Sequence, residues 1–91
     1  MINEYGELVE VLINDDKIKV ERITSNSNIT DFMISDIDEY VYILDGSAIL
    51  LIEDKEILLD KNSGFLIPKN TEHKVTYTSA DCKWLCIFLK E

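Results

Sequence analysis

The segment 38–77 most restricts the folds open to this chain, because it alternates short apolar runs with tight-turn residues. The dipeptide Asp45-Gly46 stands between β-branched and aromatic runs and favours a hairpin, since glycine accepts the positive φ of a tight turn. Glu53-Asp54-Lys55 marks a second reversal a few residues later. No window of a dozen residues carries an apolar stripe at the helical period. The segment therefore predicts an all-β antiparallel sandwich or barrel with little helix.

The residues on either side of this segment extend the same pattern. Residues 8–13 are mostly apolar, and residues 17–23 alternate charged and apolar side chains, as a strand with one wet face does. We expect a further strand at 29–34 and an acidic turn at 35–38. Residues 84–89 are apolar on both faces, so both faces of that last strand need cover.

Length and charge exclude several classes of protein. A chain of 91 residues forms one domain, and its net charge of -9 with scattered basic residues argues against binding nucleic acid or anionic membranes. The N-terminus lacks the basic and apolar regions of a signal peptide, which predicts a cytoplasmic protein. Cys82 and Cys86 lie four residues apart in one expected strand, too far apart for an unstrained disulfide, so we expect two free thiols.

Two spaced motifs in the central segment resemble those of the cupins. Glu39, six intervening residues and Gly46 are similar to the second half of the first cupin motif. The run 62–73, with Pro68 and His73 in register, is similar to the second motif. The resemblance implies a small single-domain cupin, a jelly-roll barrel of the double-stranded β-helix type. Its conserved core would be 29–91, and 1–28 would add N-terminal strands to the same domain and to a dimer interface.

The resemblance also implies where a metal would bind in related barrels. The metal-binding cupins use two histidines one residue apart, a glutamate and a histidine from the second motif. These positions fall on Met33, Ser35, Glu39 and His73 here. A thioether and a hydroxyl are poor ligands for ordinary divalent metals, and His73 is the only histidine in the chain. We therefore expect a degenerate site with no metal or other cofactor, held by Glu39 and His73 if a divalent metal binds at all.

Three substitutes for the missing ligands stay open. Asp36 or Asp38 could turn inward, although a solvated turn is the simpler interpretation of both. Cys86 could bind as a thiolate, but apolar neighbours favour a protonated core thiol. Met33 could favour copper(I).

Strand alternation predicts which side chains line the barrel. If Glu39 faces inward, so do Val41 and Ile43. If His73 faces inward, Val75 and Tyr77 share its face, while Lys74, Thr76 and Thr78 point outward. The predicted ligand-binding residues are Met33, Ser35, Glu39, His73 and Tyr77. Glu39, His73 and Tyr77 are also the candidates for acid–base catalysis, because histidine titrates near neutral pH and could hydrogen-bond the carboxylate.

Two functions follow as hypotheses. The first is a non-catalytic barrel that binds a small molecule and forms a homodimer through its apolar outer sheet faces. The alternative is a metal-dependent or acid–base enzyme acting on a small carbonyl, sugar or aromatic compound. The sequence favours the first, because it lacks the residues that give cupins their metal.

Overall fold

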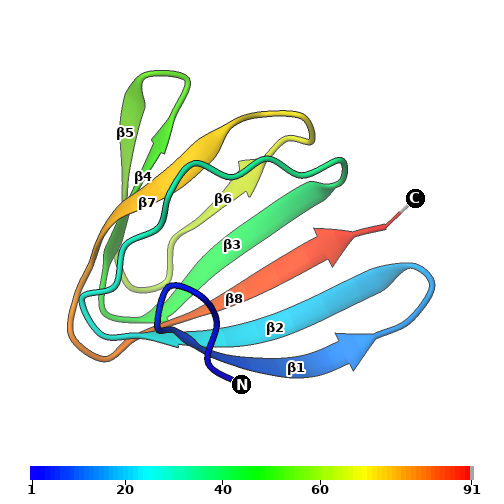
Figure 1. The fold of residues 1–91 in the computed structure, drawn as a ribbon, viewed down its shortest axis with the longest axis horizontal. Coiled ribbons are helices and arrows are strands. Elements are labelled where there is room, and N and C mark those ends of the chain that lie inside the picture. The colour runs from blue at the N-terminus through cyan, green and yellow to red at the C-terminus, as the bar shows by residue number, and fades with distance from the viewer. Residues whose placement is uncertain (91) are drawn as a thin grey trace.

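The computed structural model describes residues 1–90 and consists of β-strands joined by turns and loops (Figure 1). The strands are β1 (Leu8–Asn14), β2 (Ile18–Ser25), β3 (Asp38–Asp45), β4 (Ala48–Ile52), β5 (Lys55–Leu59), β6 (Gly64–Ile67), β7 (His73–Thr78) and β8 (Cys82–Leu89). They form a five-stranded sheet in the order β1-β2-β8-β3-β6 and a three-stranded sheet in the order β5-β4-β7. The all-β jelly-roll prediction is confirmed.

The core lies between the two sheets, and strand alternation explains its composition. In β4, Ala48, Leu50 and Ile52 are buried, while Ile49 and Leu51 face outward and stay half-exposed. In β3, Val41 and Ile43 are buried on the face that Glu39 shares, as predicted. Both cysteines are buried and free. In the part of the chain that the structure describes, no helix is long and apolar enough to cross a membrane.

The predicted hairpin at Asp45-Gly46 is wrong, because β3 and β4 belong to different sheets. Gly46 has φ +80°, and a Cβ there would clash with Ser79 Oγ and lie 3.1 Å from Cys82 Cα. The turn before β8 therefore packs directly against this glycine, which carries the chain from one sheet to the other. The second predicted reversal is a hairpin: β4 pairs with β5 through a two-residue turn at Glu53 and Asp54.

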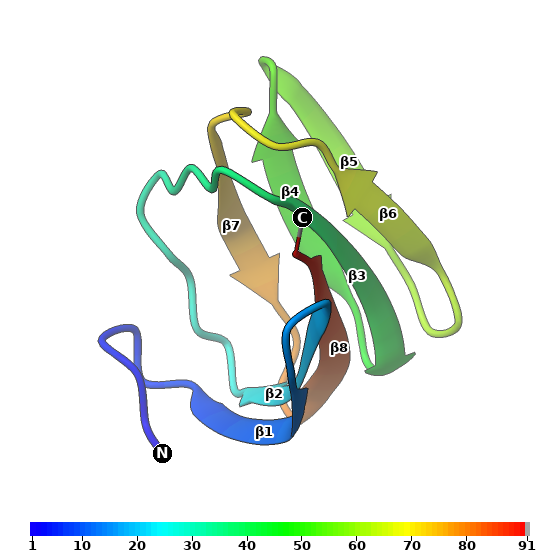
Figure 2. The same cartoon turned by 90° about the vertical axis from the view of Figure 1, so that its right-hand side faces the viewer.

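The strand expected at 29–34 is not formed. Residues 26–37 instead run beside β7 as an extended loop, and Figure 2 shows it along the side of the barrel next to that strand. A single bridge joins Met33 to His73. The Val75 N–H donates to Thr30 Oγ1 at 3.0 Å rather than to a main-chain carbonyl. A side-chain hydroxyl thus replaces part of the ladder, and the loop closes the barrel without becoming a strand.

Buried hydrogen bonds attach the N-terminal segment to the barrel. Glu7 is buried, and its carboxylate accepts from Asn3 Nδ2 at 3.1 Å and from the hydroxyl of Ser25. The Trp84 indole N–H donates to Ser25 Oγ at 3.3 Å. These contacts join residues before β1 to β2 and β8, and β1 and β2 belong to the same sheet as β8, β3 and β6.

Candidate functional site

A cavity of about 350 Å³ lies inside the barrel, between the N-terminal segment, the 26–37 loop and the inner face of the larger sheet. Its apolar wall includes Ile23, Val75, Trp84 and Phe88. A volume of this size suits a small organic ligand, and mostly apolar walls with a few polar groups are typical of ligand sites. Met33, Ser35, Glu39 and His73 all line it.

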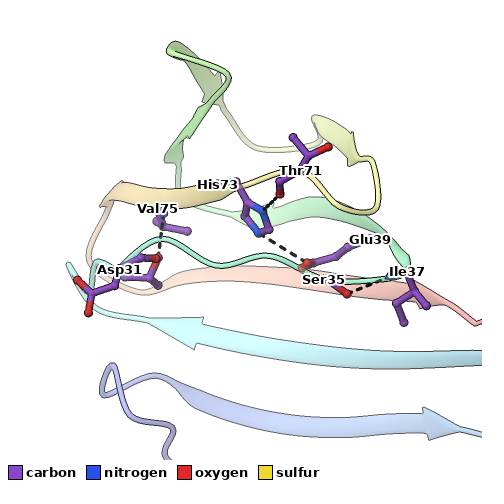
Figure 3. Close-up of polar contacts among 8 residues, drawn as sticks. Asp31, Ser35, Ile37, Glu39, Thr71, His73 and Val75 are labelled. Atoms are coloured by element: carbon purple, nitrogen blue, oxygen red, sulfur yellow. Dashed lines mark hydrogen bonds and ion pairs between the residues drawn. The ribbon is translucent and has the colours of Figure 1, made fainter.

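His73 begins β7 and is 4% exposed. Its Nδ1 lies 3.1 Å from the Thr71 carbonyl oxygen. Because a carbonyl only accepts, Nδ1 must carry a proton, and in the neutral ring Nε2 is left with a lone pair. Figure 3 shows Nε2 directed at Glu39, with 4.0 Å between Nε2 and Oε1. That separation allows an ion pair but exceeds a hydrogen bond, so the direct hydrogen bond expected between the two residues is absent.

Burial sets the electrostatics of Glu39. Desolvation raises the pKa of its carboxyl above the ordinary value, while the nearby side chains of His73 and Cys86 partly oppose that rise. Burial and the neighbouring Glu39 raise the pKa of Cys86 well above that of a free thiol. Cys86 therefore stays protonated near neutral pH, and the thiolate ligand considered from the sequence does not form.

Met33 and Ser35 are held at the cavity by backbone contacts. Met33 exchanges two main-chain hydrogen bonds with His73, at 2.7 and 2.9 Å. The Ser35 carbonyl accepts from the Asn70 N–H at 2.7 Å, and its hydroxyl accepts from the Ile37 N–H at 3.3 Å. The extended loop thus brings both predicted positions to the site beside β7.

The acidic turn residues do not reach the cavity. Asp36 is exposed. Asp38 Oδ1 accepts the Lys69 N–H at 2.8 Å, outside the cavity. Both act as turn residues, as the simpler interpretation of the sequence had it.

Tyr77 does not share the face of His73, contrary to the alternation argument. It is 45% exposed and does not line the cavity. The reason is a bulge in β7: Ile49 pairs with Tyr77 and the next residue, Leu50, pairs with Val75. Thr76 is the extra residue, so the alternation reverses after it. Thr78, expected to point outward, is buried and donates to the Asn28 carbonyl at 2.6 Å.

Three acidic residues of the cavity were missed by the sequence argument. Glu4 and Glu7 come from the N-terminal segment and Glu21 from β2. Glu21 belongs to the alternating run 17–23 and was expected on the wet face of its strand. Its side chain is 14% exposed and pairs with Lys19 at 3.2 Å. Strand alternation predicts that Lys19 and Glu21 share one face. It does not predict which face of the strand the rest of the chain covers.

The donor set does not fit the metal that the resemblance implies for related barrels. Glu39 and His73 supply one carboxylate and one imidazole. Among residues 1–90, no three or more histidine, cysteine, aspartate or glutamate side chains are grouped to hold a metal ion.

A second hollow, of about 420 Å³, lies outside the barrel near the β4–β5 turn. Glu53, Asp54 and Glu72 contribute to its rim. It is more open to solvent than the interior cavity, and none of the predicted site residues lines it. The interior cavity is therefore the better candidate for a site.

The family follows from the motifs and from the barrel that holds them. A cupin domain model matches residues 35–88, more than half of the chain, and includes both Glu39 and His73. This chain is a cupin. A comparison of the cupin with curated proteins returned no match.

Solved structures share the fold of this cupin at low sequence identity. A provisionally assigned mannose-6-phosphate isomerase from Ralstonia eutropha JMP134 is 22% identical, with a TM-score of 0.89 over 100% of this chain and 91% of that one. A cupin superfamily protein from Desulfitobacterium hafniense DCB-2 is 20% identical, with a TM-score of 0.85 over 98% and 82% of the two chains. KdgF from Halomonas sp. is 14% identical, with a TM-score of 0.87 over 97% and 82%. At these identities the likeness establishes the fold alone.

Proposed function

We propose that this cupin is a binding protein that takes a small, largely apolar molecule into its barrel without a metal. The observation that carries the proposal is the cavity of about 350 Å³, with Glu39 and His73 among apolar walls. Apolar surface favours an apolar ligand, and a few convergent polar groups fix its orientation.

Binding without a metal is consistent with the ligands that the site offers. Glu39 and His73 are two donors, whereas a catalytic zinc normally has three protein ligands. Met33 and Ser35 add a thioether and a hydroxyl that already accepts a backbone N–H. We therefore treat the site as a degenerate metal position that now contacts a ligand directly.

The test uses Trp84, the only tryptophan of the chain, which lines the cavity. Its fluorescence should change saturably when benzyl alcohol is added, and dialysis against a chelator should leave the titration unchanged. Val75→Phe should abolish the response by filling the cavity. Tyr77→Phe, on the outward side of the same strand, is the matched control and should retain it. A linear, unsaturable response, or one that disappears with the chelator, would contradict the proposal.

An acid–base enzyme is the second candidate. The supporting observation is a carboxyl whose pKa burial raises, 4.0 Å from an imidazole nitrogen. Groups with shifted pKa values in a cavity are frequent at catalytic sites. This candidate would be favoured if a bound compound were consumed by the wild-type protein and only held by Glu39→Gln. Turnover that persists in Glu39→Gln would count against it.

A further inference from the structure

We propose that the cavity selects an organic cation, a protonated amine on an apolar body, and rejects carboxylates and phosphates. This inference rests on the proposed binding function and names the chemical class of the ligand. It is carried by the charges that line the cavity and by the position of His73 Nε2, which faces Glu39 across 4.0 Å.

The charged side chains of the cavity are almost all acidic. Among the described residues that line it, four are glutamates, and none is lysine or arginine: Glu4, Glu7, Glu21 and Glu39. The α-amino group of Met1 also lies at the cavity, where it donates to the Val9 carbonyl at 3.1 Å. Lys19 offsets Glu21 from outside. The cavity therefore presents more negative charge than its neighbouring cations balance.

The partners of Glu7 and Glu39 hold these two carboxylates in place without neutralising them. Glu7 accepts from an amide and a hydroxyl, which are neutral donors. The Cys86 thiol beside Glu39 remains protonated and carries no charge. His73 approaches Glu39 only to 4.0 Å. A buried carboxylate without a close cation is costly, and a bound ammonium group would reduce that cost.

His73 provides the second, independent observation. Its ring is 4% exposed and lines the cavity, yet only Nδ1 has a hydrogen bond. Nε2 faces Glu39 across a gap that is too long for a direct bond. An ammonium nitrogen could lie about 2.8 Å from both Nε2 and Oε1, because two spheres of that radius overlap when their centres are 4.0 Å apart. It has enough protons to donate to both atoms.

The remaining wall suits the apolar part of such a ligand. Ile23, Val75, Trp84 and Phe88 provide aliphatic and aromatic surface beside the acidic groups. Aromatic side chains also attract cations through their ring faces. An anionic ligand of the same size would meet several carboxylates at close range, and like charges repel. The net charge of -9 also attracts a cationic ligand as it approaches the protein and repels an anionic one.

The experiment compares four aromatic probes of similar shape, each followed by Trp84 fluorescence and by saturation-transfer NMR: benzylamine, benzyl alcohol, benzoate and phenyl phosphate. We expect benzylamine to bind at least tenfold more tightly than benzyl alcohol. Benzoate and phenyl phosphate should bind at least tenfold more weakly than benzyl alcohol. Glu39→Gln should lower the amine-to-alcohol affinity ratio about tenfold. Glu21→Gln should lower it in the same direction and serves as a second variant if Glu39→Gln does not fold.

The matched control is Glu56→Gln, which removes the same charge from an exposed position on β5. In Glu56→Gln, the ratio of benzylamine affinity to benzyl alcohol affinity should stay within twofold of the wild-type value. An equal fall in Glu56→Gln would mean that net charge alone acts and would overturn the cavity assignment. Benzyl alcohol or benzoate binding as tightly as the amine would overturn this inference but leave the proposed function standing. No saturable binding of any probe would overturn both.

Discussion

Glu39 allows the electrostatics of the cavity to be tested at a single residue. Burial raises its folded-state pKa, so the folded protein holds this proton more tightly than the unfolded chain does. Its contribution to stability is fully present below the ordinary glutamate value of 4.5 and is lost as pH rises through the folded pKa. Glu39→Gln cannot ionise. We expect it to raise the free energy of unfolding at neutral pH by about 1 kcal/mol, and the gain to vanish in acid.

Urea denaturation over a pH series measures this difference. Glu56→Gln is the control and should stay within about 0.5 kcal/mol of wild type at every pH, because its side chain is exposed. A Glu39→Gln variant that is less stable than wild type at neutral pH would show that His73 and Cys86 stabilise the carboxylate by more than burial costs.

The sequence identified cavity residues where a motif marks them, and it missed cavity residues whose burial depends on the whole fold. Glu39 and His73 were found from two motifs 34 positions apart, and both line the cavity. Glu7 reaches the interior because it pairs with Ser25, 18 residues away. Nothing local distinguishes that glutamate from the exposed ones, so its burial could not be predicted from the sequence.

The β4–β5 hairpin provides a prediction at the scale of one element. Glu53 and Asp54 both have positive φ, at 50° and 61°. This is the backbone of a type I′ turn, which favours Asn-Gly because other residues strain there by about 1–2 kcal/mol each. The double variant Glu53→Asn, Asp54→Gly should therefore raise the free energy of unfolding by at least 1 kcal/mol, measured by urea denaturation.

A glycine placed where φ is ordinary tests the explanation. Asp36 is not among the positive-φ residues, so Asp36→Gly should destabilise the protein or leave it unchanged. If both variants had the same effect, turn geometry would not be the cause.

The ends of strands were predicted well where charged and turn residues mark them. Strand pairing was predicted poorly where it depends on residues that are distant in the sequence. Asn62 and Asn70 are typical turn residues, and both have positive φ, at 67° and 58°, which asparagine tolerates better than most residues. The sheet change at Gly46 and the bulge at Thr76 depend instead on residues distant in the sequence, Ser79 for the first and Ile49 for the second. A hairpin and a sheet crossing use the same Asp-Gly, so local sequence cannot separate them.

At the scale of the whole molecule, the edge of the larger sheet is exposed. β1 is its terminal strand, and Val11, Leu12 and Ile13 are 54%, 48% and 49% exposed. A bulge at Leu12 pairs Val11 with Glu21 and Ile13 with Val20, so apolar groups face both sides of the sheet there. Long apolar edges aggregate unless something covers them. A second copy is a suitable cover, since an antiparallel edge can pair with itself about a twofold axis. We therefore propose a homodimer through β1.

Leu12→Lys tests this interface by placing a charge in the middle of it. We expect wild type to sediment at low micromolar concentration as twice the 10.5 kDa chain, and Leu12→Lys to sediment as one chain. Leu58→Lys is the matched control: Leu58 is 60% exposed on β5, in the other sheet, and its variant should remain dimeric. Each copy carries a charge of -9, so added salt should screen the repulsion and tighten the dimer. A wild-type monomer at both low and high salt would contradict the proposal, and dissociation by Leu58→Lys alone would move the interface to β5.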